Sequence, residues 1–308
     1  MSRLKTSAII TGLSLFTVLF ISILIYRLNG PENFRDLFKT TLQGESIDSL
    51  NSRKPAENKN GPREFIIPKV ETLKPSPLTE SILRGKDYLE NTHKLLPQFV
   101  GAKMNCTNCH LNSGTTPDAG PWVGITTKFP QYRSRSATVD TLPDRVNDCF
   151  ERSLNGKRLP LDSSQMTDII SYMTFLSSGY EVGREIQGTG MPKLKLAAPP
   201  NLANGAKVYE QKCALCHQVT GEGLYAQDGK TIYPALWGGK SFNIGAGMAR
   251  LHTAAGFVKK NMPLGQGNTL TDQEAWDVAA YFTQKKRPDF AKKMKDWSKG
   301  DKPVDARY

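Results

Sequence analysis

Two short stretches decide the fold of this chain: Cys106-Thr-Asn-Cys109-His110 and Cys213-Ala-Leu-Cys216-His217. In each, two thiols three positions apart can add to the two vinyl groups of one haem, and the His that follows can reach the iron from the proximal side. The motifs therefore predict two covalently bound c-type haems. We expect thioether attachment through four thiols and iron ligation by two imidazoles: Cys106, Cys109, Cys213, Cys216, His110 and His217.

Two other interpretations of the motifs are weaker. A zinc site would need further Cys and His pairs, and only His93 and His252 remain in the chain. A redox dithiol does not explain why a His follows each pair. Haem attachment uses four of the five Cys residues, which leaves no disulfide framework.

Composition limits the class of protein. The chain has 308 residues, of which 38% are hydrophobic and 23% charged. This mixture is typical of a globular protein of about two domains, and it excludes a disordered, collagenous or polytopic membrane protein. The formal charge of +12 favours anionic partners. Basic and aromatic residues do not interleave as they do on a nucleic-acid surface, so no nucleic-acid partner is expected.

Residues 7–26 form an uncharged apolar run preceded by Arg3 and Lys5. Twenty helical residues span about 30 Å, the thickness of a bilayer core. The basic flank predicts that the N-terminus stays in the cytoplasm and that the rest is exported. We expect an uncleaved anchor within residues 1–27; a cleaved signal peptide is the alternative. Either way, the globular part would lie outside the cytoplasm, in the periplasm of a bacterium.

Patterns further along the chain predict an all-α protein with two tandem cytochrome c-like domains. No strand alternation is convincing, and residues 162–178 form an amphipathic stretch that Asp162 can cap. Thr271 and Glu274 form a capping box ahead of a closing helix. We expect the following parts: stalk 28–77, N-terminal domain 78–185, linker 186–202, C-terminal domain 203–290 and basic tail 291–308. The tail is expected to be a solvated, frayed end; docking on an anionic membrane or an acidic cytochrome is the alternative.

Each haem needs a sixth ligand. In the C-terminal domain Met262 stands before a Pro, in a loop after a helical stretch, where small c-type cytochromes present a thioether. Met248 and His252 are rivals. We expect Met262 to bind the second haem, because a Met/His pair raises the potential of the iron.

The N-terminal domain lacks such a Met but has Cys149, the only thiol not committed to haem attachment. A helix starting near Thr141 would align Arg145, Cys149 and Ser153 at intervals of four residues. A lone Cys is usually just a small buried hydrophobe. Here a cation one turn away would favour the thiolate, a good ligand for haem iron. Arginines such as Arg135 could bind a small dianion.

The chain resembles the dihaem thiosulfate dehydrogenase (tetrathionate synthase) family. The stretches that match are NCTNCH, AGPWVGITTKFPQYRSR, RVNDCFERSLNGKRLP, CALCH and NMPLG, between about residues 80 and 290. The resemblance implies that two thiosulfate ions are joined to tetrathionate, or the reverse, with transfer of two electrons. It also implies that Cys149 is the distal ligand of the first haem and that thiosulfate binds among Arg135, Arg145 and Ser153. Some members have a Lys immediately before the Met; here Asn261 stands at that position, although Lys260 is near.

Two other functions remain open at this point. The chain could be a membrane-tethered dihaem electron carrier without its own substrate, which would not require the Cys149 and arginine stripe. It could also be a sulfur-carrier cytochrome that joins thiosulfate to the Cys of a partner. Electrons from an enzyme of this type would leave to a small cytochrome or another carrier. The sequence fixes neither the carrier nor the preferred direction.

Overall fold

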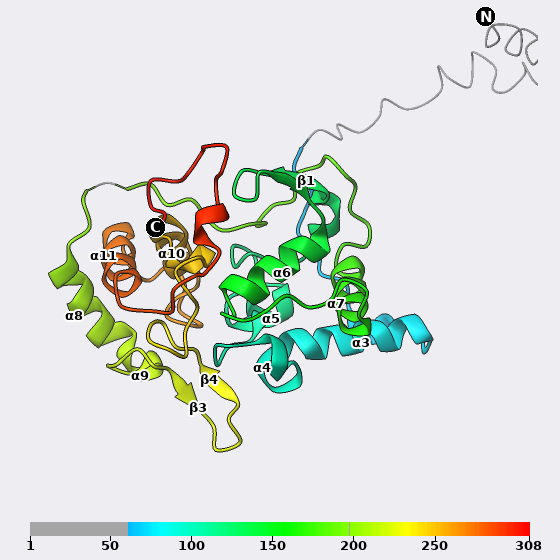
Figure 1. The fold of residues 1–308 in the computed structure, drawn as a ribbon, viewed down its shortest axis with the longest axis horizontal. Coiled ribbons are helices and arrows are strands. Elements are labelled where there is room, and N and C mark those ends of the chain that lie inside the picture. The colour runs from blue at the N-terminus through cyan, green and yellow to red at the C-terminus, as the bar shows by residue number, and fades with distance from the viewer. Residues whose placement is uncertain (1–60, 197) are drawn as a thin grey trace, which may run out of the picture. The chain divides into compact units, whose positions relative to one another are not determined.

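The structure, a computed structural model, describes residues 61–196 and 198–308. The apolar run 7–26 and most of the expected stalk lie outside the described residues. Within the described part of the chain, no helix has the length and apolar character needed to cross a membrane. Residues Gly61–Tyr308 pack as one compact unit (Figure 1).

The N-terminal half of this unit is mostly helical (Figure 1). Its helices are α3 (Pro77–Glu90), α4 (Thr92–Leu95), α5 (Leu111–Gly114), α6 (Leu142–Arg152) and α7 (Ser164–Phe175). Single 3-10 turns occupy Val70–Thr72, Pro97–Phe99, Cys106–Asn108 and Ile125–Lys128. An antiparallel hairpin joins β1 (Gln131–Arg133) to β2 (Thr138–Asp140), with Tyr132 opposite Val139.

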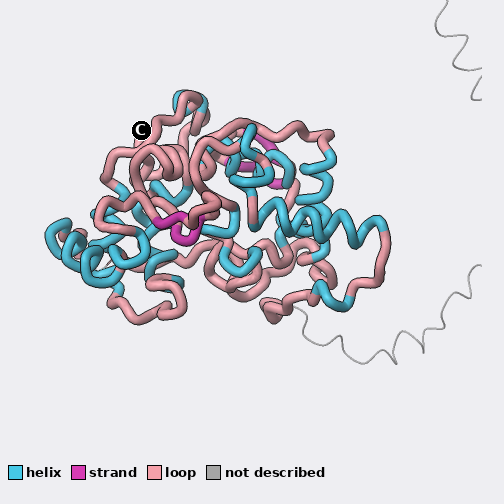
Figure 2. The backbone as a smooth tube through the Cα atoms, turned by 90° about the horizontal axis from the view of Figure 1, so that it is seen from below, coloured by secondary structure: helices cyan, strands magenta, loops and turns pink. Residues whose placement is uncertain are grey.

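The C-terminal half repeats this plan. Its helices are α8 (Leu202–Lys212), α9 (Ala214–His217), α10 (Leu251–Asn261) and α11 (Asp272–Thr283). Its hairpin pairs β3 (Leu224–Tyr225) with β4 (Thr231–Tyr233), and 3-10 turns occupy Gly247–Ala249 and Lys293–Lys295. Strands of two or three residues are too short to carry an alternating pattern, which is why the sequence did not reveal them. Loops make up much of both halves (Figure 2).

Side-chain caps set where the helices begin. The Thr271–Glu274 capping box is confirmed, and Thr141 forms a second one with Asp144 at the start of α6. The expectation that Asp162 caps α7 is wrong. The cap is Ser163, whose hydroxyl accepts a hydrogen bond from the Met166 N–H at 3.2 Å.

A glycine lies at the main helix crossing of each half. Where α3 crosses α7, a Cβ on Gly85 would lie 1.9 Å from the carbonyl oxygen of Asp168. Where α8 crosses α11, a Cβ on Gly205 would lie 2.1 Å from the carbonyl oxygen of Asp277. The backbones can approach this closely only because neither position has a side chain. The two halves are therefore built on the same helix crossing.

Each half has its own apolar core. In the first, Phe150, Ile169 and Tyr172 are among the buried residues; in the second, Trp276 is completely buried. Phe242 belongs by sequence to the C-terminal half but packs into the core of the N-terminal half. This contact joins the two halves into one unit.

Residues 291–308, which we call the C-terminal strap, pack against both halves, so the expectation of a frayed end is wrong. Trp297 is only 7% exposed, and its backbone N–H donates a hydrogen bond to the backbone carbonyl of Arg135 at 2.8 Å. Asp305 accepts hydrogen bonds from Arg250 and from the backbone N–H of His252, both at 3.0 Å. In Figure 1 the strap (red) passes between α10 and α6.

The helix crossings yield a first prediction. Gly85→Ala and Gly205→Ala should each lower the free energy of unfolding by about 2–3 kcal/mol, because the added methyl group forces the paired helices apart. Urea denaturation of the holoprotein measures the loss. Gly239→Ala is the matched control, since a Cβ there meets nothing within 4 Å. Equal effects of all three substitutions would contradict the close-crossing argument.

Candidate active site

The first CxxCH motif faces a cavity of about 260 Å³ in the N-terminal half. Six of the residues predicted for the site line it: Cys106, Cys109, His110, Arg145, Cys149 and Ser153. Cys106 and Cys109 are free thiols rather than a disulfide, as haem attachment requires.

A backbone carbonyl orients His110. Its Nδ1 lies 2.5 Å from the carbonyl oxygen of Gly120, and its ring lies 4.9 Å from that of Trp122. An N–H on Nδ1 donates to this carbonyl, which leaves the Nε2 lone pair free for a metal. This is the arrangement that a proximal haem ligand needs.

The second motif faces a cavity of about 630 Å³ lined by Cys213, Cys216, His217 and Met262. His217 Nδ1 lies 2.8 Å from the carbonyl oxygen of Pro234, so its Nε2 is also free. Burial lowers the pKa of His217, which favours the neutral imidazole that binds iron. In the part of the chain that the structure describes, no group of three or more His, Cys, Asp or Glu residues could hold a metal ion.

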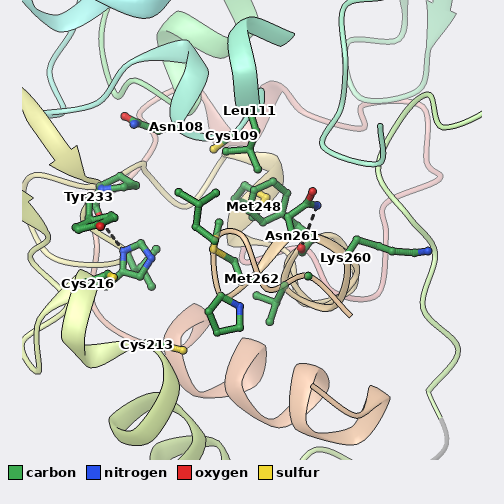
Figure 3. Close-up of a pocket in the computed structure, with 18 of the residues that line it drawn as sticks. Asn108, Cys109, Leu111, Cys213, Cys216, Tyr233, Met248, Lys260, Asn261 and Met262 are labelled. Carbon is green, nitrogen blue, oxygen red and sulfur yellow. Dashed lines mark hydrogen bonds between the residues drawn. The ribbon is translucent and has the colours of Figure 1, made fainter. Parts of the chain in front are cut away.

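The other candidate ligands of the second haem differ in their position relative to this cavity. Met248 lines the same cavity, and Figure 3 shows both thioethers near its centre, between the cysteines of the two motifs. His252 is half exposed and its Nδ1 lies 2.9 Å from Asp305, outside this cavity. Lys260 extends away from Met262 in Figure 3, and its Nζ lies 3.7 Å from an oxygen of Asp118.

The side chain of Asn261, the residue immediately before Met262, is held in hydrogen bonds to the backbone. Its side-chain amide donates to the carbonyls of Asp118 and Phe257, at 3.2 and 3.1 Å. The bond to Asp118 crosses to the N-terminal half. Asn261 therefore fixes the end of α10, from which Met262 projects.

The two cavities share a wall. Met104 and Cys109 line both of them, and the second cavity is also lined by Asn108, within the first motif, and by Leu111, which follows it. Cys109 is visible at the edge of the second cavity in Figure 3. Groups bound in the two cavities would thus be separated by little more than the segment that carries the first CxxCH motif.

Cys149 is the one thiol with a clearly lowered pKa among those the structure describes. Burial alone would raise the pKa of Cys149, but the charge of Arg145 and the nearby His110 offset this and lower it to about 7. Nη1 of Arg145 donates to the Cys149 sulfur at 3.1 Å. By contrast, burial raises the pKa of Cys106 and of Cys109 to about 12. Arg145 thus makes Cys149 a thiolate donor near neutral pH.

A polar cavity of about 330 Å³, which we call the outer cavity, adjoins the cavity of His110. Arg145 and Ser153 line both the outer cavity and the cavity of His110. Arg135 lines the outer cavity only. Three of the four predicted catalytic residues, Arg145, Cys149 and Ser153, thus line the cavity of His110, and Arg135 lines only the adjoining outer cavity.

An ion network holds the wall of the outer cavity. Arg152 donates two hydrogen bonds to Asp296 of the strap, at 2.7 and 2.8 Å. Arg135 lies 3.7 Å from the same carboxylate, donates to the carbonyl of Gly245 at 2.7 Å, and lies over the ring of Trp297. Burial lowers the pKa of Arg135 to about 10. Asp296 and Trp297 of the strap thus hold the side chain of Arg135, a predicted site residue, in its orientation.

Sequence reasoning missed several residues of these cavities. Met191, from the segment taken as a linker, lines the cavity of His110. Arg250 and Trp297 line the outer cavity. No local pattern marks any of them, because each reaches its cavity through contacts between distant segments.

The donor sets of both cavities fit c-type haems, and comparisons with known proteins agree. Residues 98–182 match the SoxA/TsdA cytochrome c domain, and residues 202–286 match cytochrome c. A thiosulfate dehydrogenase from Psychrobacter arcticus is 43% identical over 271 residues, which cover 84% of this chain and 83% of that protein. The chain belongs to the thiosulfate dehydrogenase family. It contains two cytochrome c domains and binds two c-type haems.

Further relatives support this membership. A thiosulfate dehydrogenase from Allochromatium vinosum is 44% identical over 230 residues, which cover 73% of this chain and 85% of that one. The solved structure of thiosulfate dehydrogenase TsdBA from Marichromatium purpuratum matches with a TM-score of 0.70 and 36% identity. That match covers 73% of this chain but 50% of the other.

The ion network yields a second prediction. Asp296→Asn should lower the free energy of unfolding by about 3 kcal/mol, because it leaves the buried Arg152 guanidinium without its carboxylate. Urea denaturation of the holoprotein tests this. Asp289→Asn is the matched control: that carboxylate is exposed, lies 2.6 Å from Lys293 at the surface and accepts the backbone N–H of the neighbouring Phe290. The network has no structural role if both variants unfold like the parent protein.

Proposed function

We propose that the protein joins two thiosulfate ions to tetrathionate, or cleaves tetrathionate in reverse, at a haem that His110 and Cys149 would hold. One observation carries the proposal: the Cys149 sulfur, activated by Arg145 at 3.1 Å, lines the cavity that holds His110 and borders a basic outer cavity. An electron carrier needs neither this thiol nor these arginines. The family to which the chain belongs supports the same reaction.

The first step forms a bond between Cys149 and thiosulfate. Arg145 and Ser153 bind the sulfonate oxygens and so bring the terminal sulfur of thiosulfate beside the thiolate. A sulfur–sulfur bond forms between the two, which releases two electrons and leaves thiosulfate covalently attached to Cys149. Bound haem supplies iron that accepts these electrons one at a time. No proton moves, because both sulfur atoms enter as anions.

The second step needs no oxidant. The terminal sulfur of a second thiosulfate attacks the sulfur of the adduct that carries the sulfonate group. The bond to Cys149 breaks, its electron pair returns to the cysteine as thiolate, and tetrathionate leaves. Positive charge around the outer cavity offsets the repulsion between two anions that would otherwise keep apart.

We propose that electrons pass between the two haem sites across the wall that the two cavities share. His110 and Cys149 would hold the first haem, and His217 and Met262 the second. A thiolate lowers the potential of iron and a thioether raises it, so electrons would pass from the first centre to the second. From there a small cytochrome or another carrier would take them.

We also infer that the enzyme works outside the cytoplasm, anchored by residues 7–26. The basic flank of this apolar run and the two motifs for covalent haem attachment support this location. Residues between the run and the globular unit would then serve as a stalk.

Cys149 provides the third prediction. Cys149→Ala and Cys149→Ser should each lower kcat for thiosulfate oxidation by at least about 1,000-fold, because neither side chain supplies a thiolate. Steady-state assays with a defined electron acceptor measure kcat. Haem content should stay at two per chain, since the attachment residues are unchanged. Turnover near that of the parent protein in either variant would rule out the covalent role.

Met262 provides the fourth prediction. Met262→Leu should lower the midpoint potential of the second haem by on the order of 100 mV and remove the absorption typical of Met ligation, because the thioether is lost. Spectroelectrochemistry measures both. Met248→Leu, in the same cavity, is the matched control and should change neither. If only the control variant loses the absorption, Met248 is the ligand.

A further inference from the structure

Five arginines line the outer cavity, more cations than one bound thiosulfate needs. They come from three parts of the chain: the β1–β2 hairpin, helix α6 and the start of α10. The set is Arg133, Arg135, Arg145, Arg152 and Arg250. Among the residues that line this cavity, Asp148 is the one carboxylate, and it lies 3.7 Å from Arg152.

Two of the five are occupied by the protein itself. Both terminal nitrogens of Arg152 donate to Asp296, and a terminal nitrogen of Arg135 donates to the carbonyl of Gly245. These two arginines hold the strap against the cavity. Arg145 is the inner cation, since it contacts the Cys149 sulfur.

The other two have donors to spare. Arg250 uses only Nε, at 3.0 Å from Asp305, so neither of its terminal nitrogens has a hydrogen-bond partner among the described residues. Arg133 reaches Asp140 only at 3.7 Å, and its buried Nε has no hydrogen-bond partner in the described part of the chain. Both guanidinium groups are mostly shielded from solvent, with 28% and 29% of the side chain exposed. Shielded donors without partners are costly unless a ligand satisfies them.

We propose that Arg133 and Arg250 form a second anion subsite, which binds the sulfonate group of the second thiosulfate and hence the outer sulfonate of tetrathionate. This inference rests on the proposed function. Tetrathionate carries a sulfonate at each end. When one end lies at Arg145 and Ser153 beside Cys149, the other must point away from the haem cavity. The outer cavity is the space that adjoins those two residues on that side.

The electrostatics of the cavity agree with this placement. Burial and the neighbouring charge of Arg145 lower the pKa of Arg133. Arg250 is among the charges that lower the pKa of Arg135. Cations held this close repel one another, and a dianion between them relieves the repulsion.

The subsite is shared between the two cytochrome c domains. Arg133 belongs to the hairpin of the first domain, and Arg250 immediately precedes α10 of the second. The strap contributes Trp297 and Pro303 to the same cavity, and Asp305 of the strap holds Arg250 in place. The second domain thus takes part in substrate binding.

Equilibrium binding to the holoprotein tests the subsite without turnover. Tetrathionate is titrated into the oxidised Cys149→Ala holoprotein, which has no electrons to give and no thiolate to attack the ligand, and thiosulfate into the reduced form of the same variant, which can accept none; the arginine substitutions are made in this background. Isothermal titration calorimetry gives Kd for each. Arg133→Gln and Arg250→Gln should each raise Kd for tetrathionate about 10-fold and change Kd of the tighter thiosulfate site less than about 3-fold. Arg145→Gln should weaken both ligands.

Arg63→Gln is the matched control, because Arg63 is exposed and lies outside the cavity. Arg133→Gln leaves the Arg250–Asp305 ion pair intact, so it reports on the subsite even if Arg250→Gln disturbs the strap. Equal weakening of both ligands, or no change in either, would overturn the second subsite. Failure of the parent protein to turn over thiosulfate would instead overturn the proposed function, and the binding constants would still decide the subsite.

Discussion

The contact between Arg145 and Cys149 is the constraint on which the proposed chemistry of this protein depends. The two are four positions apart on one helix, so the regular turn of α6 alone brings guanidinium and sulfur to 3.1 Å. The capping box at Thr141 fixes where that helix begins and therefore which face the pair occupies. Because the cation stabilises the thiolate, a thiol that burial would otherwise keep protonated becomes a donor near neutral pH.

Gathering arginines around a buried sulfur has a structural cost, and the strap offsets it. Asp296 is almost fully buried and bonds to Arg152 while lying near Arg135. Without that carboxylate, neighbouring guanidinium groups would repel one another in a poorly solvated place. The same segment supplies Trp297 as part of the cavity wall. The stability of the fold and the proposed substrate recognition are therefore linked through a part of the chain that the sequence predicted to be a frayed basic end.

Much of the site could be read from local sequence. The CxxCH spacing, the Arg145–Cys149–Ser153 stripe and the helix starts at Thr141 and Thr271 all depend on neighbours within eight residues. What the sequence did not reveal depends on long-range contacts. Arg152 and Asp296 are 144 positions apart, and nothing in either neighbourhood marks the other. Met191 and Arg250 were missed for the same reason, because a loop residue without periodicity carries no sign of the cavity that it lines.

The wall formed by Met104 and Cys109 limits how far the two domains are independent modules. The second cavity takes part of its lining from the segment that would hold the first cofactor, and the first cavity takes Gly190 and Met191 from the connecting segment. Removing the first domain would therefore open the pocket of the second one to water. Protein engineers who wish to transplant one half into a different redox scaffold will therefore need to rebuild the missing surface along with it.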